Sequence, residues 1–369
     1  MDIKKIDKNF DTTVVAPEDI EWFSVLESPF SIYGVTYSQE EGLFRRLPKD
    51  VAVATSEGVA HLSTHTAGGR IRFATDSPYI AIHAEEPFEA PMAHMTFAGK
   101  YGFTIFHNNT FSGTIMPSYK QLVSADTSLG GDGTIVFGGM KRPYFAKDGM
   151  YEAQIFMPLY IKVKKLYIGL QKGCKLEAAK EYKHKKPIVF YGSSITQGGC
   201  ASKPGDDYIN RLSTMLDTDI VNLGFAGSAR GEKTIAEYVA SLDASVFVLD
   251  YDHNASQLQY LKDTHFALYE TVRKANPNTP IVMMTMPTID EYQPRDGHWR
   301  RRDVIFETIE RAKALGDENI HIIDCYGCFG KLVNGECGTV DNCHPDSLGF
   351  LRMAEALLPV LRKALGEEE

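Results

Sequence analysis

The sequence predicts two domains of different classes: an all-β sandwich or barrel, followed by a three-layer α/β/α domain around a five-stranded parallel sheet. The chain has 369 residues, which is enough for about two domains of 100–200 residues each. The first half carries short β-rich runs between turn residues, whereas the second half alternates apolar runs with helical patterns. We therefore expect the domains to span residues 1–180 and 181–369.

The first half is expected to form antiparallel strands. The β-rich runs lie at 71–76, 79–85, 102–107, 134–139, 153–161 and 165–170. Turn signals such as Gly68-Gly69 and Ser77-Pro78 separate them. No stretch of ten or more residues has a convincing helical period there, so an antiparallel sandwich or barrel is predicted.

The second half has the period of βαβ units. Apolar runs are expected to form strands at 187–192, 219–224, 245–250, 280–287 and 319–324. Helical patterns follow at 206–217, 232–242, 257–275, 300–315 and 346–365. Strands that are continuously apolar and alternate with helices predict a parallel sheet that is covered on both faces. The charged segment 177–187 is the predicted linker between the domains.

Composition and charge exclude several classes of partner. The chain is 43% hydrophobic and 24% charged, as ordinary globular proteins are. Its 39 basic and 48 acidic residues give a net charge of −9, which disfavours nucleic acid and anionic membranes. No apolar run is long enough to span a bilayer, and residues 1–13 lack the apolar core of a secretory signal, so a cytoplasmic protein is expected. The sequence leaves open whether the chain forms a homo-oligomer.

Polar residues follow the ends of the predicted parallel strands. Ser194 comes after the first strand, Gly227 after the second and Asn254 after the third, and Asp341 and His344 come one loop after the fifth. Ligands of open parallel sheets bind beyond the carboxyl ends of the strands, so these residues are expected to meet there. A hydroxyl, a glycine backbone, an amide and an Asp/His pair are the parts of an acyl-transfer site.

These blocks resemble the SGNH/GDSL hydrolase family of esterases and lipases. GSSIT matches the first block of the family with Ser194 as nucleophile, GFAG matches the second at Gly227, and Asn254 matches the third. The last block, Asp-x-x-His, matches Asp341 and His344. The resemblance implies a flavodoxin-like catalytic domain and, because a two-domain bacterial branch of the family is similar, a jelly-roll-like sandwich before it.

Two of the blocks depart from the family pattern. Ser193 stands where the family usually has Asp, and the third block, usually Gly-x-Asn-Asp, is Asp252-His253-Asn254-Ala255 here. A small polar residue at position 193 is expected to hold the loop equally well. The second departure means that the turn around Asn254 must differ from that of the family.

The resemblance implies a mechanism and assigns roles. Ser194 attacks an ester carbonyl, His344 takes its proton, and Asp341 orients the imidazole. The Ser194 and Gly227 N–H groups and the Asn254 amide form the oxyanion hole. No metal or cofactor is required.

We therefore expect a serine esterase or deacylase that acts on a short-chain ester, with an acetylated carbohydrate as the substrate and an acyl-serine intermediate. One alternative is an acyltransferase that uses the same triad with an alcohol acceptor. A second is a carbohydrate-binding protein whose hydrolase domain is inert.

Each residue also has a structural interpretation. Ser194 and Asn254 could cap helices, and Asp341 and His344 could be a helix cap and a surface histidine. His253 could line the pocket or be a structural polar group. The four cysteines of the last third are interpreted as loop thiols, with a zinc site as the less favoured alternative: Cys325, Cys328, Cys337 and Cys343.

Two further segments could contribute to binding. Trp22, Phe23 and the segment 61–70 could line a binding face or close over the active site, although aromatic residues in such a domain more often fill its core. The segment 288–302 carries Tyr292, His298, Trp299 and three consecutive arginines, and could form a pocket wall or a solvated helix start.

Overall fold

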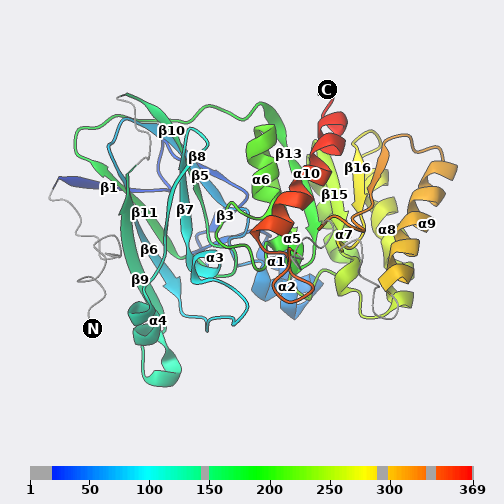
Figure 1. Cartoon of the computed structure of the whole chain (residues 1–369), viewed down its shortest axis with the longest axis horizontal. Helices are drawn as coiled ribbons and strands as arrows, with labels where there is room; N and C mark the ends of the chain where they lie inside the picture. Colours follow the sequence, from blue (N-terminus) through cyan, green and yellow to red (C-terminus); the bar gives the residue numbers. More distant parts are fainter. Residues whose placement is uncertain (1–18, 143–148, 289–297, 330–337, 368–369) are drawn as a thin grey trace.

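The computed structural model describes residues 19–142, 149–288, 298–329 and 338–367, and the β-rich first half lies beside the α/β second half (Figure 1). In the described residues, no helix combines the length and the apolar character needed to cross a membrane.

The first half is an antiparallel sandwich. One sheet has the order β1 (Ile20–Ser24), β11 (Lys165–Gln171), β6 (Ile80–Pro87) and β9 (Thr134–Lys141). The other has the order β12 (Leu176–Glu177), β5 (Arg70–Thr75), β10 (Tyr151–Phe156), β7 (Phe103–His107) and β8 (Thr110–Ile115), with β2 (Ser31–Tyr33) also paired to β5. Alternate side chains of the strands, such as Ile71 and Phe73, are fully buried between the sheets. The predicted sandwich is confirmed.

The first half also contains short helices and a small two-stranded sheet. The sheet pairs β3 (Thr36–Ser38) with β4 (Leu43–Arg45). The helices are α1 (Lys49–Thr55), α2 (Glu57–Leu62), α3 (Phe97–Tyr101) and α4 (Tyr119–Ala125), and a 3₁₀ turn, η3, covers Thr127–Leu129. Leu47, Ala52, Val59 and Leu62 pack into a core of the second half, so α1 and α2 belong to the first half in sequence but to the second in packing.

The second half has a five-stranded parallel sheet. The order is β14 (Thr218–Gly224), β13 (His184–Gly192), β15 (Val246–Asp250), β16 (Ile281–Met284) and β17 (Ile320–Ile323). Counted along the chain this is the order 2-1-3-4-5, which is the doubly wound, flavodoxin-like arrangement. The predicted fold class is confirmed.

Helices cover both faces of this sheet. The cores place α6 (Tyr208–Leu216) and α10 (Ser347–Ala364) on one face, and α7 (Lys233–Ser241), α8 (Leu258–Ala275) and α9 (His298–Ala314) on the other. Within β13, Ile188 and Phe190 face the α6–α10 layer, whereas Val189 and Tyr191 face the α7–α8–α9 layer. Both faces of the strand are thus buried, which explains why these strands are uninterrupted apolar runs in the sequence.

Candidate active site

The turn from β13 into the short helix α5 (Ser194–Gln197) positions Ser194. The Ser193 backbone N–H donates to the Asp250 carbonyl at 3.1 Å, which fixes the turn to the end of β15. The Ser193 side chain accepts from the Ile195 N–H at 3.2 Å and is the cap of α5. Ser193 therefore has the capping role that was an alternative for Ser194, and the Ser194 hydroxyl has a different partner.

That partner is His344, and the two are part of a Ser–His–Asp chain. The Ser194 Oγ lies 2.9 Å from the His344 Nε2, and the His344 Nδ1 lies 2.8 Å from an oxygen of Asp341. With the Nδ1 proton donated to the carboxylate, Nε2 carries the lone pair that can accept the serine proton. The structure thus brings Ser194 together with His344, which lies 150 positions later in the sequence, and with Asp341, which lies three positions before His344.

A narrow loop holds the histidine and the aspartate. Thr339 forms a bridge with Pro345, and the Val340 N–H donates to the His344 carbonyl at 2.9 Å. The other oxygen of Asp341 accepts from the His344 N–H at 2.7 Å, so backbone and ring of His344 are bound to the same carboxylate. The cap of α10 is Asp346, not Asp341, because the Asp346 side chain accepts from the first N–H groups of that helix.

The surroundings of Asp341 favour its charged form. Partial burial acts to raise the pKa of this carboxyl, but hydrogen bonds from the backbone and ring of His344 outweigh it and hold the pKa below its usual value. Asp341 is therefore ionised at neutral pH, as a carboxylate that stabilises an imidazolium must be.

The predicted oxyanion donors lie at neighbouring strand ends. Ser194 begins α5, where the first backbone N–H groups have no acceptor within the helix. Gly227 has φ +67°, a conformation that favours glycine, and no atom lies within 4 Å of the position where a Cβ would be. Its backbone therefore stands open for close approach of a ligand.

The Asn254 amide is oriented by a backbone carbonyl. Its Nδ2 donates to the Phe225 carbonyl at 3.0 Å, which leaves the second N–H of the amide for another acceptor. Asn254 ends the 3₁₀ turn η4 (Asp252–Asn254), and Gln257 rather than Asn254 precedes α8. Arg301 holds this turn in place, because it donates to the Asp252 and Ala255 carbonyls at 2.7 and 2.9 Å.

A buried network joins the first two strand ends. The Gln197 side chain accepts from the Ala226 N–H at 3.1 Å and approaches the His65 Nδ1 at 3.3 Å. A Cβ at Gly224 would lie 2.2 Å from the Gln197 nitrogen, so only glycine lets β14 end this close to α5. His65 of the predicted segment 61–70 is thus a buried residue that contacts the Gln197 side chain.

Two residues near Ser194 and His344 were not predicted. The Tyr160 hydroxyl donates to the Ser194 carbonyl at 3.1 Å, and the His94 ring lies 5.6 Å from the His344 ring, centroid to centroid. Both belong to the first half of the chain, so the sandwich side reaches the strand ends. No local motif marks either residue, since the contacts arise only when the two halves pack together.

Other candidates lie elsewhere. Trp22 is 41% exposed, and its ring makes a T-shaped contact with the ring of His83 in the β1–β11–β6–β9 sheet. Phe23, in contrast, packs with Phe30 against the sandwich core. Tyr292 and the side chain of His298 lie outside the described residues, and Trp299 is exposed. Cys325, Cys328 and Cys343 are free cysteines, and Cys337 lies outside the described residues.

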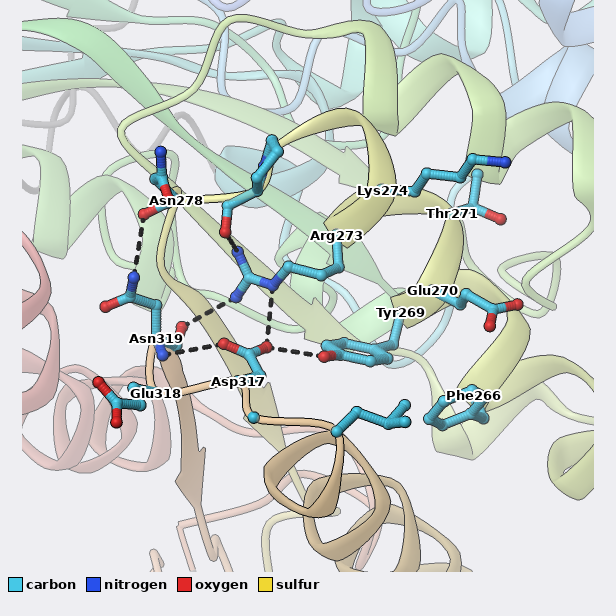
Figure 2. A pocket seen from close by; sticks show the side chains of 13 residues that line it. Phe266, Tyr269, Glu270, Thr271, Arg273, Lys274, Asn278, Asp317, Glu318 and Asn319 are labelled. Carbon is cyan, nitrogen blue, oxygen red and sulfur yellow. Dashed lines mark hydrogen bonds and ion pairs between the residues drawn. The ribbon is translucent and has the colours of Figure 1, made fainter.

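A hollow of about 830 Å³ lies at the opposite edge of the sheet, before β16 and β17 (Figure 2). Its central side chains bind one another: an oxygen of Asp317 accepts from the Tyr269 hydroxyl at 2.7 Å and from the Arg273 Nε at 2.8 Å. Arg273 also donates to the Thr279 and Asn319 carbonyls at 2.7 and 3.1 Å. These groups brace the loops between α8 and β16 and before β17.

Comparison with known families identifies both halves. Residues 185–362 match the GDSL-like lipase/acylhydrolase family, and residues 20–176 match a family described as the N-terminus of SGNH-hydrolase-type esterases. Comparison with functionally curated proteins found no match.

Several solved structures are similar over nearly the whole chain. A candidate GDSL-like lipase from Bacteroides ovatus is 27% identical, with a TM-score of 0.81 over 95% of this chain and 99% of that one. The salicylyl-acyltransferase SsfX3 of a tetracycline biosynthetic pathway is 18% identical, with a TM-score of 0.73 over 95% and 99%. A family two carbohydrate esterase from Clostridium thermocellum, in complex with cellohexaose, is 14% identical, with a TM-score of 0.62 over 91% and 99%. The last two likenesses are of fold alone.

Proposed function

Because this chain belongs to the GDSL-like lipase/acylhydrolase family of hydrolases, we propose that it is a serine esterase that removes a short acyl group, acetyl in the first instance, from a carbohydrate. The observation that carries the proposal is the Ser194–His344–Asp341 chain, with distances of 2.9 and 2.8 Å. A hydroxyl in contact with an imidazole that is itself oriented by a carboxylate is the arrangement that activates a serine nucleophile.

The reaction proceeds through an acyl-enzyme. The Ser194 Oγ attacks the ester carbonyl as its proton passes to the His344 Nε2, and Asp341 stabilises the imidazolium that forms. The Ser194 and Gly227 N–H groups and the free Asn254 N–H donate to the oxyanion. His344 then protonates the departing alcohol, and a water activated by the same ring releases the acid.

The acyl and alcohol preferences come from two arguments. The sequence has no long apolar lid segment to cover a fatty chain, which favours a short acyl group. The fold neighbours include a carbohydrate esterase in complex with cellohexaose, which favours a sugar as the alcohol.

An acyltransferase is the second candidate, and the fold likeness to SsfX3 over 95% of the chain favours it. Both reactions share the acyl-enzyme and differ only in the group that resolves it. Product analysis with added acceptor alcohols separates them: a transferase gives the new ester in excess over free acid, and a hydrolase gives mainly acid.

The first experiment is release of p-nitrophenol from p-nitrophenyl acetate by the wild type and by Ser194→Ala. We expect the wild type to turn over and the variant to lose at least about 100-fold in kcat/KM, given the size of triad effects. Intact-protein mass spectrometry of the wild type, quenched during turnover, should find one added acetyl group that is absent from the variant. Equal activity of the two proteins would remove Ser194 as the nucleophile.

A further inference from the structure

Three metal-ligating side chains meet beside the proposed nucleophile. His94, Cys200 and His344 each offer one donor atom, and these atoms all lie within 4.8 Å of one another. They come from three separate parts of the chain: the segment between β6 and α3, the segment after α5, and the Asp-x-x-His loop. The proposed mechanism uses only His344, so the other two have no assigned role.

The donor set suits Zn²⁺. One thiolate and two imidazoles are ligands that zinc takes in proteins, at about 2.3 Å for sulfur and about 2.0 Å for nitrogen, in tetrahedral geometry. Ligand atoms around such an ion are about 3.3–3.7 Å apart, so the three donors need to close by about 1 Å. His94 is only half-buried, so its side chain is the one that can make this adjustment.

His344 is already prepared as a zinc ligand. Its Nδ1 is bound to Asp341 at 2.8 Å, which leaves the Nε2, 2.9 Å from the Ser194 Oγ, as the nitrogen with a lone pair to give to a metal. A carboxylate that holds the second nitrogen of a histidine is the usual support of a zinc-binding imidazole. The contact that makes His344 a base therefore also makes it a ligand.

Cys200 supplies the sulfur from a fixed backbone. The residue is 6% exposed and has φ +73°, a conformation that is uncommon outside glycine. Burial, followed by the nearby Asp341, raises the pKa of the Cys200 thiol to about 12. The thiol is therefore protonated in the metal-free protein, and it loses its proton to solvent when sulfur binds a cation.

We propose that His94, Cys200 and His344 form an inhibitory Zn²⁺ site. Zinc takes the Nε2 lone pair that would otherwise accept the Ser194 proton, so the bound protein cannot activate its nucleophile. The fourth position of the ion is open to water or to the Ser194 hydroxyl. Inhibition rests on the proposed esterase function, whereas zinc binding does not.

The test measures binding and activity separately. Isothermal titration of the full chain with ZnCl₂ should give one site that is lost on adding EDTA. Cys200→Ser and His94→Ala should each weaken zinc binding at least tenfold, while the Ser194→Ala protein, which keeps all three ligands, still binds. Zinc should inhibit p-nitrophenyl acetate hydrolysis over the same concentration range, and both ligand variants should be active but resistant.

Matched controls use a thiol and a histidine outside the cluster. Cys174→Ser and His83→Ala should bind zinc within about twofold of the wild type, and thermal unfolding should establish that every variant is folded. If His94→Ala and Cys200→Ser bind zinc as the wild type does, the site is wrong. If zinc binds through these ligands while a Ser194-dependent activity is unaffected, the inhibitory role is wrong. If the protein binds zinc but has no esterase activity, the proposed function fails and the binding site stands.

Discussion

Asn254 matches the family pattern, whereas its neighbours Asp252 and Ala255 depart from it. The bond to the Phe225 carbonyl at 3.0 Å fixes which way the amide points. One N–H is bound to that carbonyl, and the other is the proposed oxyanion donor. The geometry of one side chain therefore decides whether the unusual turn is compatible with catalysis.

Asn254→Ala should lower kcat by about 10²- to 10³-fold with little change in KM, because the lost donor acts mainly on the charge of the transition state. Asn254→Asp, which keeps the shape but replaces the donors by a carboxylate, should be at least as impaired. Steady-state kinetics with p-nitrophenyl acetate measure both. Nearly wild-type kcat in Asn254→Ala would place the oxyanion elsewhere.

Individual site residues could be predicted from the sequence where they belong to a motif. Ser194, Asp341 and His344 follow strand ends in a fixed order, so parallel-sheet topology alone predicts that they meet. Tyr160 and His94 have no such signal. Their proximity to Ser194 and His344 depends on how the two halves pack, and no local pattern encodes it.

At the scale of elements, Arg46 connects the segment after β4 to the end of β14. Its fully buried guanidinium donates to the Leu62 and His65 carbonyls at 2.7 and 2.9 Å. It also donates to the Asn222 and Gly224 carbonyls at 3.0 and 2.6 Å. Burial lowers the pKa of Arg46 to about 9, so the group is still charged at neutral pH.

Arg46→Met should lower the free energy of unfolding by at least about 3 kcal/mol, because four buried carbonyls lose their donor. Urea denaturation followed by circular dichroism measures the loss. The control is Arg302→Met, which breaks a partly exposed ion pair with Asp324 and should cost less than about 1 kcal/mol. If the two variants lose a similar free energy of unfolding, the hydrogen bonds of Arg46 do not stabilise the contact between the two halves.

Asp250 at the end of β15 makes stability depend on pH. Burial is the main cause that raises its pKa to about 6, with the neighbouring Asp252 adding to the effect. Between about pH 4 and 6 the folded protein binds this proton more tightly than the unfolded chain, so this group's contribution to stability falls as pH rises through that range.

Asp250→Asn should remove that loss while keeping an acceptor for the Thr196 hydroxyl. The stability of the variant relative to the wild type should therefore rise by up to about 3 kcal/mol between pH 4 and pH 7, since one pKa unit corresponds to about 1.4 kcal/mol. Urea titrations at several pH values test this. A difference that is constant across the range would mean that Asp250 ionises normally in the folded protein.

Helices and strands were predictable where burial of one face, or of the whole element, produces a regular pattern of apolar residues in the sequence. The expected strand 245–250 and helix 257–275 appear as β15 and α8, within one residue at each end. In contrast, α1 and α2 break at Ser56, so neither is long enough to show a helical period. The strand β8 was missed because its sequence, TFSGTI, has few apolar residues and a central glycine.

At the scale of the whole molecule, part of the first half of the sequence packs in a hydrophobic core of the second half. Ala52 of α1 and Val59 of α2 are at most 1% exposed, and they pack in the same core as Ile235 and Val239 of α7. Figure 1 shows α1 and α2 lying against the α/β half. Arg70 of β5 also pairs with Asp219 of β14 across the boundary. The sandwich is therefore joined to the sheet by an apolar face, a buried network and an ion pair.

The predicted domain of residues 181–369 should consequently not fold alone. Without α1 and α2 it exposes the apolar surface of α7, and without Arg46 the end of β14 loses its donor. We expect the fragment to bind a hydrophobic dye and to unfold without a cooperative transition, whereas the full chain unfolds cooperatively. Co-expression with residues 1–180 should restore a soluble complex with Ser194-dependent activity, because all the contacts between the halves are then present. A fragment that is folded and as active as the full chain would instead establish residue 180 as a true domain boundary. It would also mean that α1 and α2 are not needed for the fold of the second half.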